Sequence, residues 1–425
     1  MNAKPGKQRG SAKLAIGLVI LLFFMWGLTM NLLNSLNEPF KTYMELSTTE
    51  STLLQVAYYG AYFVMAIPAA AVAKRWGYKA GIIMGLALFA AGCLITIPAV
   101  NALSYAIFLL AMFVVAAGAT TLETNANPYI TKLGDEKSES LRLNIAQSFN
   151  GVGSVAGPLI ASALLPKAAL EATSPEQMAS IREAVFNNIG VVYIVLAVVL
   201  VLILVAFVGI RLPEPPADEE ESAGSAKISS LLKFPHFSTG ILAEFLFIGA
   251  QVGGMALIAS YAVKHMGEIS SAQGAIYLTV ATALFAIGRI VTTPLMAKWE
   301  ASKILGVYMI AAAVCFAVGV AGLGVFSTWA IVIAYFFISI GFPTIYSLSL
   351  RGFRGDAAKT GASLLTMSIV GAAIVPLIMG LMTDTWGIES AFGLGALIFV
   401  YCAWYAFKGS KLNRSDVPEN NKVEA

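Results

Sequence analysis

Long apolar runs constrain this chain more than any other feature, because few folds can accommodate them. Twelve runs approach or exceed the roughly 20 residues that an α-helix needs to cross about 30 Å of hydrocarbon. Backbone polar groups cannot stay unpaired in lipid, so runs of this length are predicted as helices and not as strands. The predicted spans are 14–39, 50–73, 79–99, 103–132, 141–166, 188–211, 237–263, 271–298, 302–324, 328–350, 357–383 and 388–407.

The composition is that of a chain embedded largely in lipid. Of its 425 residues, 58% are hydrophobic and only 12% are charged, about half the charged share of a soluble domain. The three cysteines lie inside apolar runs and are interpreted as small hydrophobic residues without a disulfide framework. The first run follows the basic segment MNAKPGKQRGSAK and lacks a small-residue cleavage site, so it is interpreted as a span rather than a signal peptide.

The positions of lysine and arginine predict the orientation. If the N-terminus is cytoplasmic, only four of the 27 Lys and Arg fall in outer segments, namely Lys41, Lys167, Arg182 and Lys264. Apart from Arg289, which lies in a span, all the others fall in inner segments, as the positive-inside rule requires. A net charge of +3 is too small to indicate nucleic acid as a partner. We therefore expect a lipid-embedded chain with both termini cytoplasmic.

A polar linker divides the spans into two sets of six. The segment LPEPPADEEESAGSAKISSLL at 212–232 has the prolines, acidic run and small residues of a linker. AKRWGYKAGIIMGL after the second span also resembles AKWEASKILGVYMI after the eighth. Two six-helix halves around a central substrate site are the architecture of a secondary transporter. The predicted parts are an N-terminal half (1–211), a cytoplasmic linker (212–235), a C-terminal half (236–410) and a cytoplasmic tail (411–425).

The stretch LETNANPYI places a carboxylate and two amides inside the fourth span. Glu123 costs at least ~2.5 kcal/mol there, so it is expected to face a cavity or a partner. Asn127 shares its helix face four residues later, and Pro128 loosens the helix at this point. The alternative is a hydrogen bond that only packs two helices together. We favour a ligand-binding role for Glu123 and Asn127.

Other spans carry further amides. In the fifth span Asn144, Gln147 and Asn150 form a stripe beside Gly151, Gly153 and Gly157, which are expected to allow close helix approach. These amides either line a cavity or pack helices. Asn31 and Asn34 in the first span and Gln251 in the seventh are predicted to line the same cavity, whereas Tyr58 and Tyr59 in the second are interpreted as packing residues.

Two charged residues lie at similar distances from the inner ends of their helices. Glu244 in the seventh span and Arg289 in the eighth are predicted to pair or to share a polar network. Buried charges need partners, so this contact is either a static ion pair or a moving gate.

The polar side chains suit a neutral ligand rich in hydroxyl groups. Amides donate and accept, a carboxylate accepts, and aromatic rings take the apolar face of a sugar. A permeating anion would need basic residues, and only Arg289 is available. His236 and His265 lie at membrane edges, away from any Cys or Asp cluster, so neither a metal site, a cofactor nor an enzymatic centre is predicted.

Several long motifs carry a family resemblance. They are FFMWGLTMNLLNSLNEPF, YYGAYFVMAIPAAAVAKRWGYKAGIIMGL, LETNANPYITKLG, LRLNIAQSFNGVGSVAGP, GAQ at 249–251, IGR at 287–289 and FPTIYSL at 342–348. With these motifs the chain resembles the major facilitator superfamily and, within it, the fucose–galactose–glucose:proton symporter family. The resemblance implies an all-α transporter that moves a monosaccharide, L-fucose or a related hexose such as galactose or glucose, with a proton.

The resemblance also implies residue roles. Glu123 matches a fourth-helix carboxylate taken to bind sugar and to take part in proton coupling. Gln147 and Asn150 match amides that line the sugar cavity, and Gln251 and Arg289 fall on family-pattern positions.

Two positions depart from the fucose branch of the family. Asn34 stands where that branch has an Asp read as the principal protonation site, and an amide does not titrate. Sodium bound by carboxylate and amide oxygens, or uncoupled transport, therefore remains an alternative to proton symport. Phe342 replaces a Tyr and is more similar to the glucose/galactose branch.

Other function classes fit these residues less well. A sugar sensor would add a long signalling extension, for which the short predicted tails leave no room. A drug or metabolite exporter of the same fold would favour an apolar, aromatic cavity over amides. We therefore expect a monomeric sugar transporter of the bacterial inner membrane.

Overall fold

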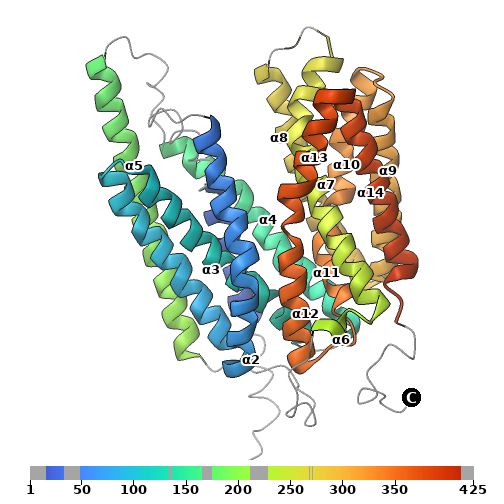
Figure 1. Cartoon of the computed structure of the whole chain (residues 1–425), viewed down its shortest axis with the longest axis horizontal. Helices are drawn as coiled ribbons and strands as arrows, with labels where there is room; N and C mark the ends of the chain where they lie inside the picture. Colours follow the sequence, from blue (N-terminus) through green and yellow to red (C-terminus); the bar gives the residue numbers. More distant parts are fainter. Residues whose placement is uncertain are drawn as a thin grey trace, which may run out of the picture. The chain divides into compact units, whose positions relative to one another are not determined.

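The structure is a computed structural model that describes residues 16–32, 48–133, 136–164, 175–210, 228–267, 269 and 271–412. Every regular element in these residues is helical (Figure 1). A helix over Ile16–Leu32 comes first. The labelled elements are α2 (Thr48–Asn101), α3 (Tyr105–Lys132), η1 (Glu136–Ser138), α4 (Glu139–Leu164), α5 (Pro175–Gly209), α6 (Ile228–Leu231), α7 (Pro235–His265), α8 (Ser271–Thr292), η4 (Thr293–Ala297), α9 (Ala301–Val320), α10 (Val325–Ile338), α11 (Gly341–Ser349), α12 (Gly355–Ser368), α13 (Gly371–Trp386), α14 (Ile388–Trp404) and η5 (Tyr405–Gly409).

The described helices account for all twelve predicted spans. Nine are long and apolar enough to cross a membrane, and α2 covers two predicted spans. Gly77, at φ 81°, turns the chain between those two spans, in a backbone region that glycine enters without steric cost. The shorter apolar helix at the N-terminus and the amide-bearing α4 supply the remaining two.

The tenth and eleventh spans are each made of two helices. α10 ends before Ser339 and α11 begins at Gly341, and a similar break separates α12 from α13. Pro343 lies in the first turn of α11, where its missing N–H costs nothing. A Cβ on Gly371 would lie 2.0 Å from the carbonyl oxygen of Phe245, so α13 starts where α7 approaches most closely. Val325–Ser349 and Gly355–Trp386 are each long and apolar enough for one span, so the sequence predicted uninterrupted helices.

The chain divides into two compact units. The first unit holds 1–129 and 149–214, and the second holds 130–148 and 215–425. The change of unit after residue 214 falls inside the linker predicted over 212–235. The end of α3 and the first part of α4 belong to the second unit, although the sequence predicts an N-terminal half over 1–211.

In the first unit, small residues bring α2 and α3 together. A Cβ on Gly85 would lie 2.8 Å from the Leu122 side chain, and one on Gly118 would lie 2.5 Å from the amide nitrogen of Phe89. α2 also packs against α5. The ammonium of Lys79 donates to carbonyl oxygens at the end of α5, at 2.7 Å and 3.0 Å, which satisfies groups that a helix end leaves free.

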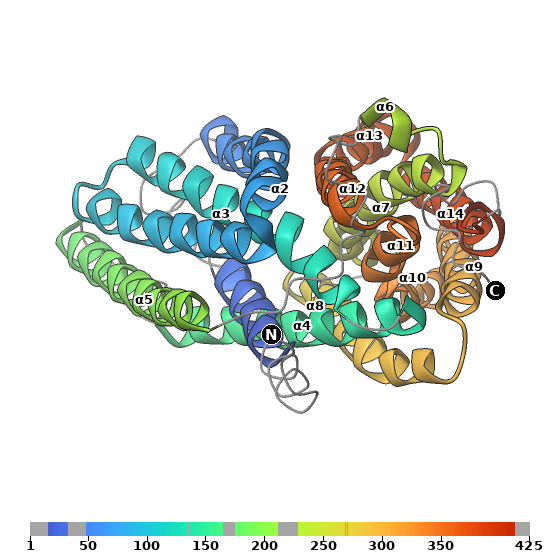
Figure 2. The ribbon, with the colours of Figure 1, turned by 90° about the horizontal axis from the view of Figure 1, so that it is seen from below.

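In the second unit, α7 packs against α8, α11, α13 and α14, while α9 lies between α10 and α14 (Figure 2). Phe316 of α9 is buried and contacts the rings of Tyr335, Phe392 and Phe399 at centroid distances of 6.4, 5.2 and 5.0 Å. This aromatic cluster fixes the positions of α10 and α14 on α9.

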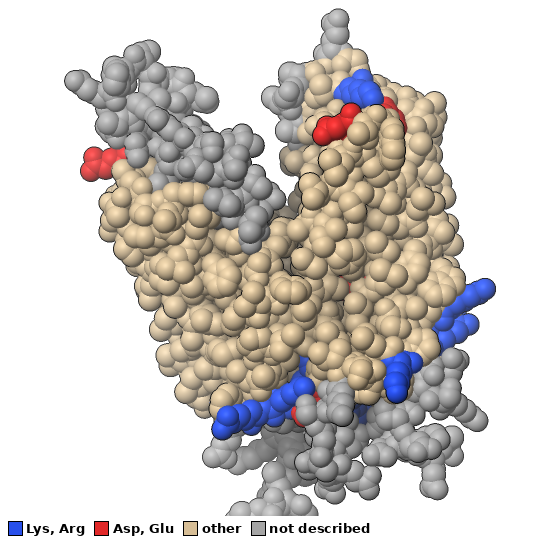
Figure 3. Space-filling model, in the orientation of Figure 1, with Lys and Arg blue, Asp and Glu red and all other residues tan. Residues whose placement is uncertain are grey.

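The described surface is that of a membrane protein. In Figure 3 its middle band carries almost no charged side chains, and Lys and Arg gather mainly at one edge. Large apolar side chains such as Leu202, Leu377 and Leu397 are exposed within the spans. Contiguous apolar surface of this kind is stable only against lipid or another protein.

Candidate functional site

Glu123 lies buried in α3, within a span of the first unit. The phenol of Tyr62, from α2, donates a hydrogen bond to its carboxylate. The other carboxylate oxygen, Oε2, has no hydrogen-bond partner among the described residues. A buried carboxylate that keeps a free acceptor oxygen is suited to bind a hydroxyl group or a cation.

Two tyrosines of α2, Tyr58 and Tyr62, lie close to this carboxylate. The hydroxyls of Tyr58 and Tyr62 are 3.4 Å apart, and their rings are 5.3 Å apart. Tyr59 packs edge-on to Tyr58 at 5.2 Å. Tyr58 and Tyr59 pack together as predicted, but the role of Tyr62 was missed. The i, i+4 spacing from Tyr58 to Tyr62, which places both on one helix face, was the available signal.

The two amides beside Glu123 have different environments. Asn125 donates to the carbonyl oxygen of Thr121 at 2.7 Å, and a Cβ on Gly81 would lie 2.2 Å from its Oδ1. Asn125 therefore packs α3 against α2. Asn127 is fully buried, yet neither its amide nitrogen nor its amide oxygen has a hydrogen-bond partner among the described residues. A buried amide without partners is costly, which favours Asn127 as a ligand-binding group.

The first helix and α4 meet through backbone contacts. The side-chain nitrogen of Asn150 donates to the carbonyl oxygen of Phe23 in the first helix at 3.1 Å. The side-chain nitrogen of Asn31 donates within its own helix, to the carbonyl oxygen of Gly27 at 3.0 Å. A Cβ on Gly153 or Gly157 would lie 2.1 or 2.6 Å from the first helix's backbone, so these predicted close approaches are confirmed. The prediction is wrong for Gly151, which has nothing within 4 Å. Asn34 lies outside the described residues.

Gln147 and Arg289 meet in the second unit. The guanidinium of Arg289 donates to the main-chain oxygens of Gln147 at 3.0 Å and of Ser339 at 2.9 Å. Ser339 caps the C-terminal end of α10, where carbonyl groups are free and a cation is favourable. Arg289 therefore stabilises the break between α10 and α11. The Nε2 atom of Gln147 is buried without a partner among the described residues.

The predicted pairing of Glu244 with Arg289 is not present in this structure. Both hydrogen bonds of Arg289 go to main-chain oxygens, and no ion pair between described residues joins it to Glu244. Glu244 is fully buried and interacts electrostatically with Cys402 and Tyr405. In this structure the hydrogen-bond partners of Arg289 are the main-chain oxygens of Gln147 and Ser339.

Gln251 and Phe342 are both half-buried. The hydroxyl of Tyr335 donates to the main-chain oxygen of Gln251 at 2.9 Å, which leaves the Gln251 side chain to other interactions. The ring of Phe342 lies 5.9 Å from that of Tyr346.

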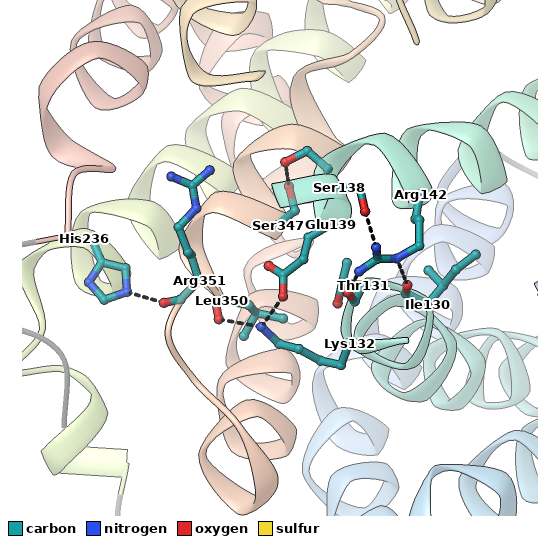
Figure 4. Close-up of polar contacts among 11 residues, drawn as sticks. Ile130, Thr131, Lys132, Ser138, Glu139, Arg142, His236, Ser347, Leu350 and Arg351 are labelled. Carbon is teal, nitrogen blue, oxygen red and sulfur yellow. Dashed lines mark hydrogen bonds and ion pairs between the residues drawn. The ribbon is translucent and has the colours of Figure 1, made fainter. Parts of the chain in front are cut away.

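A polar cluster attaches residues 130–148 to α11 at one end of the second unit (Figure 4). Lys132 binds Glu139 at 2.8 Å and donates to the carbonyl oxygen of Leu350 at 3.2 Å. The hydroxyls of Ser140 and Ser347 are 2.6 Å apart. Asn144 donates to the hydroxyl of Thr344 at 3.2 Å. We call these residues the inner cluster: Lys132, Glu139, Ser140, Asn144, Thr344, Ser347 and Leu350.

Arg142 of α4 bonds to the end of α3 and to η1. Its guanidinium donates to the carbonyl oxygens of Ile130, at 2.9 Å, and Thr131, and to the hydroxyl of Ser138 (Figure 4). These carbonyls lie at the C-terminal end of α3, where a cation is favourable. The small hydroxyl residues of the inner cluster gave no sequence signal, because Ser and Thr are common in membrane helices.

Comparison with known proteins decides the family. The Major Facilitator Superfamily sequence model matches residues 15–369. The chain belongs to this superfamily. It is 32% identical over 409 residues to the L-fucose-proton symporter of Escherichia coli (strain K12), with 93% of each chain covered. It is 33% identical over 398 residues to a glucose/galactose transporter of Brucella abortus biovar 1 (strain 9-941), with 93% and 94% covered.

A solved structure of the superfamily agrees with the fold. The crystal structure of the transporter FucP in the outward conformation matches with a TM-score of 0.87 at 31% identity, covering 95% of this chain and 100% of that one. The predicted all-α fold and the predicted family are therefore confirmed. These relatives are named as transporters and not as enzymes.

Proposed function

We propose that this protein carries a monosaccharide across the membrane together with a proton, by alternating access. The observation that carries this proposal is Glu123, a buried carboxylate with one oxygen bonded to Tyr62 and one without a partner among the described residues. Ionisable groups inside the membrane are costly and mark transport pathways. The names of the relatives, L-fucose-proton symporter and glucose/galactose transporter, support the same chemistry.

The side chains around Glu123 suit a hexose. Tyr62, with Tyr58 beside it, offers an aromatic face to the apolar side of a sugar ring, and the amide of Asn127 offers a donor and an acceptor. In the second unit the buried Nε2 of Gln147 offers a further donor. We propose that Glu123, Asn127 and Gln147 bind the sugar, together with Asn31, Asn34, Asn150, Gln251 and Phe342.

We propose the proton as the coupling ion and Glu123 as its site. Asn34 cannot replace a titrating carboxyl, so sodium coupling and uncoupled transport are the alternatives to proton coupling. Each predicts a different result in an uptake experiment. A sodium ion held by the Glu123 carboxylate and amide oxygens would make uptake depend on sodium. An uncoupled carrier would bring the sugar only to equal concentrations on both sides.

We further propose that the protein is a monomer of a bacterial inner membrane with both termini in the cytoplasm. The support for this orientation is the distribution of lysine and arginine along the sequence, because cytoplasmic segments are enriched in both. Accessibility of introduced cysteines in the linker to an impermeant thiol reagent tests the orientation.

The decisive experiment is uptake into proteoliposomes that contain the purified protein. Labelled L-fucose, galactose and glucose are offered separately, under an inward proton gradient, an inward sodium gradient or no gradient. We expect at least one sugar to accumulate above its external concentration under the proton gradient alone. Accumulation that requires the sodium gradient would overturn proton symport. The absence of accumulation under both gradients would also overturn it.

A further inference from the structure

The exposed face of α14 changes from apolar to basic where the helix ends. Leu397, Val400 and Trp404 are exposed, and their spacing of three and four residues places them on one helix face. Lys408, four residues further on in η5, is exposed as well. This face therefore presents apolar side chains along the span and a cation at its end.

Trp404 marks the level at which the face changes. Its ring lies 5.5 Å from that of Tyr401, whose hydroxyl donates to the carbonyl oxygen of Thr239 at 3.1 Å. A Cβ on Gly409 would lie 3.1 Å from the Trp404 ring, so this ring packs over η5. Trp and Tyr are enriched where hydrocarbon meets the lipid headgroups, which places Lys408 at the level of the headgroups.

The neighbouring helix α9 has the same pattern at the same end. α9 packs against α14 (Figure 2). Val307 and Ile310 of α9 are exposed. Lys303, one turn before Val307, is exposed at the start of the helix. Two adjacent helices thus combine an exposed apolar face with a lysine at the same end.

The two basic ends meet where α9 contacts η5. A Cβ on Gly306 would lie 2.4 Å from the ring of Phe407. Lys303 precedes Gly306 by one turn, and Lys408 follows Phe407 directly. The main-chain nitrogen of Lys411 donates to the carbonyl oxygen of Lys408 at 3.3 Å, which keeps Lys411 beside it. Three lysines therefore lie around this contact.

The lysines outnumber the carboxylates recorded beside them. Glu300 pairs with Lys303 at 3.1 Å and also accepts a hydrogen bond from the hydroxyl of Ser302 at 2.9 Å. No ion pair between residues that the structure describes involves Lys408 or Lys411. The surface therefore carries an excess of positive charge next to side chains that face hydrocarbon.

We propose that this surface of α9, α14 and η5 binds an anionic phospholipid. The ammonium groups of Lys303, Lys408 and Lys411 donate to phosphate oxygens, while the acyl chains lie along Val307 and Val400. Basic sites between membrane helices suit such headgroups, and the lysine stems cover apolar surface while their ammonium groups reach the phosphate. A zwitterionic phospholipid would bring its own cationic group toward the lysines, so it binds less tightly. This inference is independent of which substrate the protein transports.

Native mass spectrometry of the detergent-solubilised protein, titrated with single lipids, tests this site. We expect phosphatidylglycerol to bind more tightly than phosphatidylcholine with the same acyl chains. Lys408→Gln/Lys411→Gln should weaken the tightest binding of phosphatidylglycerol about tenfold or more. The control, Lys137→Gln/Lys233→Gln, removes two exposed lysines of the same unit and should leave that binding unchanged. Equal affinity for the two lipids, or equal losses in the two variants, would overturn the proposal.

A second measurement locates the lipid in a bilayer. Bromine atoms on acyl chains quench nearby tryptophans, and the difference between wild type and Trp404→Phe isolates the emission of Trp404. We expect brominated phosphatidylglycerol to quench Trp404 more strongly than brominated phosphatidylcholine at the same mole fraction. Trp386, exposed at the end of α13, is the control, and both lipids should quench it equally. Equal quenching of Trp404 by the two lipids would overturn the proposal.

Discussion

Tyr62 donates a hydrogen bond to the carboxylate of Glu123 inside the first unit. This bond joins α2 to α3 within the spans, and the second carboxylate oxygen has no hydrogen-bond partner among the described residues. Under the proposed symport, we expect sugar binding and proton binding at Glu123 to depend on the same phenol.

Removing the hydroxyl of Tyr62 measures its contribution to sugar uptake. We expect Tyr62→Phe to lower kcat/KM for sugar uptake about tenfold or more, because a hydrogen bond to a charged group contributes about 1.5–3 kcal/mol. Tyr193→Phe is the control, since Tyr193 is a buried tyrosine of the same unit whose hydroxyl contacts Thr96. Equal losses in both variants would show that Tyr62 acts only through packing.

Alanine substitutions of Asn125 and Asn127 should separate an effect on stability from an effect on sugar binding. Asn127→Ala loses no internal hydrogen bond, so we expect its melting temperature to be unchanged and sugar affinity to fall about tenfold. Asn125→Ala loses its bond to Thr121 and should destabilise the protein by about 1–3 kcal/mol without changing affinity. Melting in detergent and calorimetric sugar titration measure both effects. The reverse pattern would contradict the assignment of Asn127 to the ligand.

Two glycines of α4, Gly153 and Gly151, allow a matched test of how closely α4 packs against the first helix. A Cβ on Gly153 would lie 2.1 Å from the carbonyl oxygen of Phe24, whereas Gly151 has nothing within 4 Å. We expect Gly153→Ala to destabilise the protein by about 1–3 kcal/mol through overpacking. Gly151→Ala should be neutral or stabilising by up to about 1 kcal/mol, because alanine favours helix. Thermal melting of both variants checks this contrast.

Two ion pairs of the second unit differ in burial and should differ in strength. Lys132–Glu139 is nearly buried, whereas the side chains of Lys303 and Glu300 are 74% and 52% exposed. We expect Glu139→Gln to cost about 3–5 kcal/mol, because it leaves a buried cation unpaired, and Glu300→Gln about 0–1 kcal/mol. Similar melting temperatures for the two variants would argue against a stabilising inner cluster.

The contribution of Glu300 to the stability of the protein depends on pH, because its carboxyl has a shifted pKa. The hydroxyl of Ser302 and, next, the ammonium of Lys303 lower the pKa of Glu300 below its ordinary value. The contribution is therefore present at neutral pH and is lost as the pH falls below about 4 toward the lowered pKa. The difference in melting temperature between wild type and Glu300→Gln should disappear over that range.

The spans could be predicted from sequence because lipid imposes length and hydropathy on each of them. The helix breaks before Gly341 and Gly371 could not, since Val325–Ser349 and Gly355–Trp386 are each long and apolar enough for one uninterrupted span. These breaks arise from close approach of α7 and from the reach of Arg289, which are properties of the packed unit. The main-chain partners of Arg289, at Gln147 and Ser339, could not be predicted either, because carbonyl groups give no signal in the residue types.

The candidate site could be predicted in part. Glu123 stands out because a carboxylate is rare in a span, whereas Tyr62 resembles any aromatic core residue until its hydroxyl is placed. Asn125 and Asn127 look equivalent in sequence. Only their three-dimensional neighbours distinguish the amide that is hydrogen-bonded from the one without a partner among the described residues.

The most direct test of the central claim is the pH change that sugar causes in lightly buffered proteoliposomes. Addition of a saturating transported sugar to the wild type should alkalinise the external medium, because protons enter with the sugar. Glu123→Gln should give no pH change under the same conditions. A Glu123→Gln protein that still takes up protons with sugar would show that Glu123 is not the coupling site.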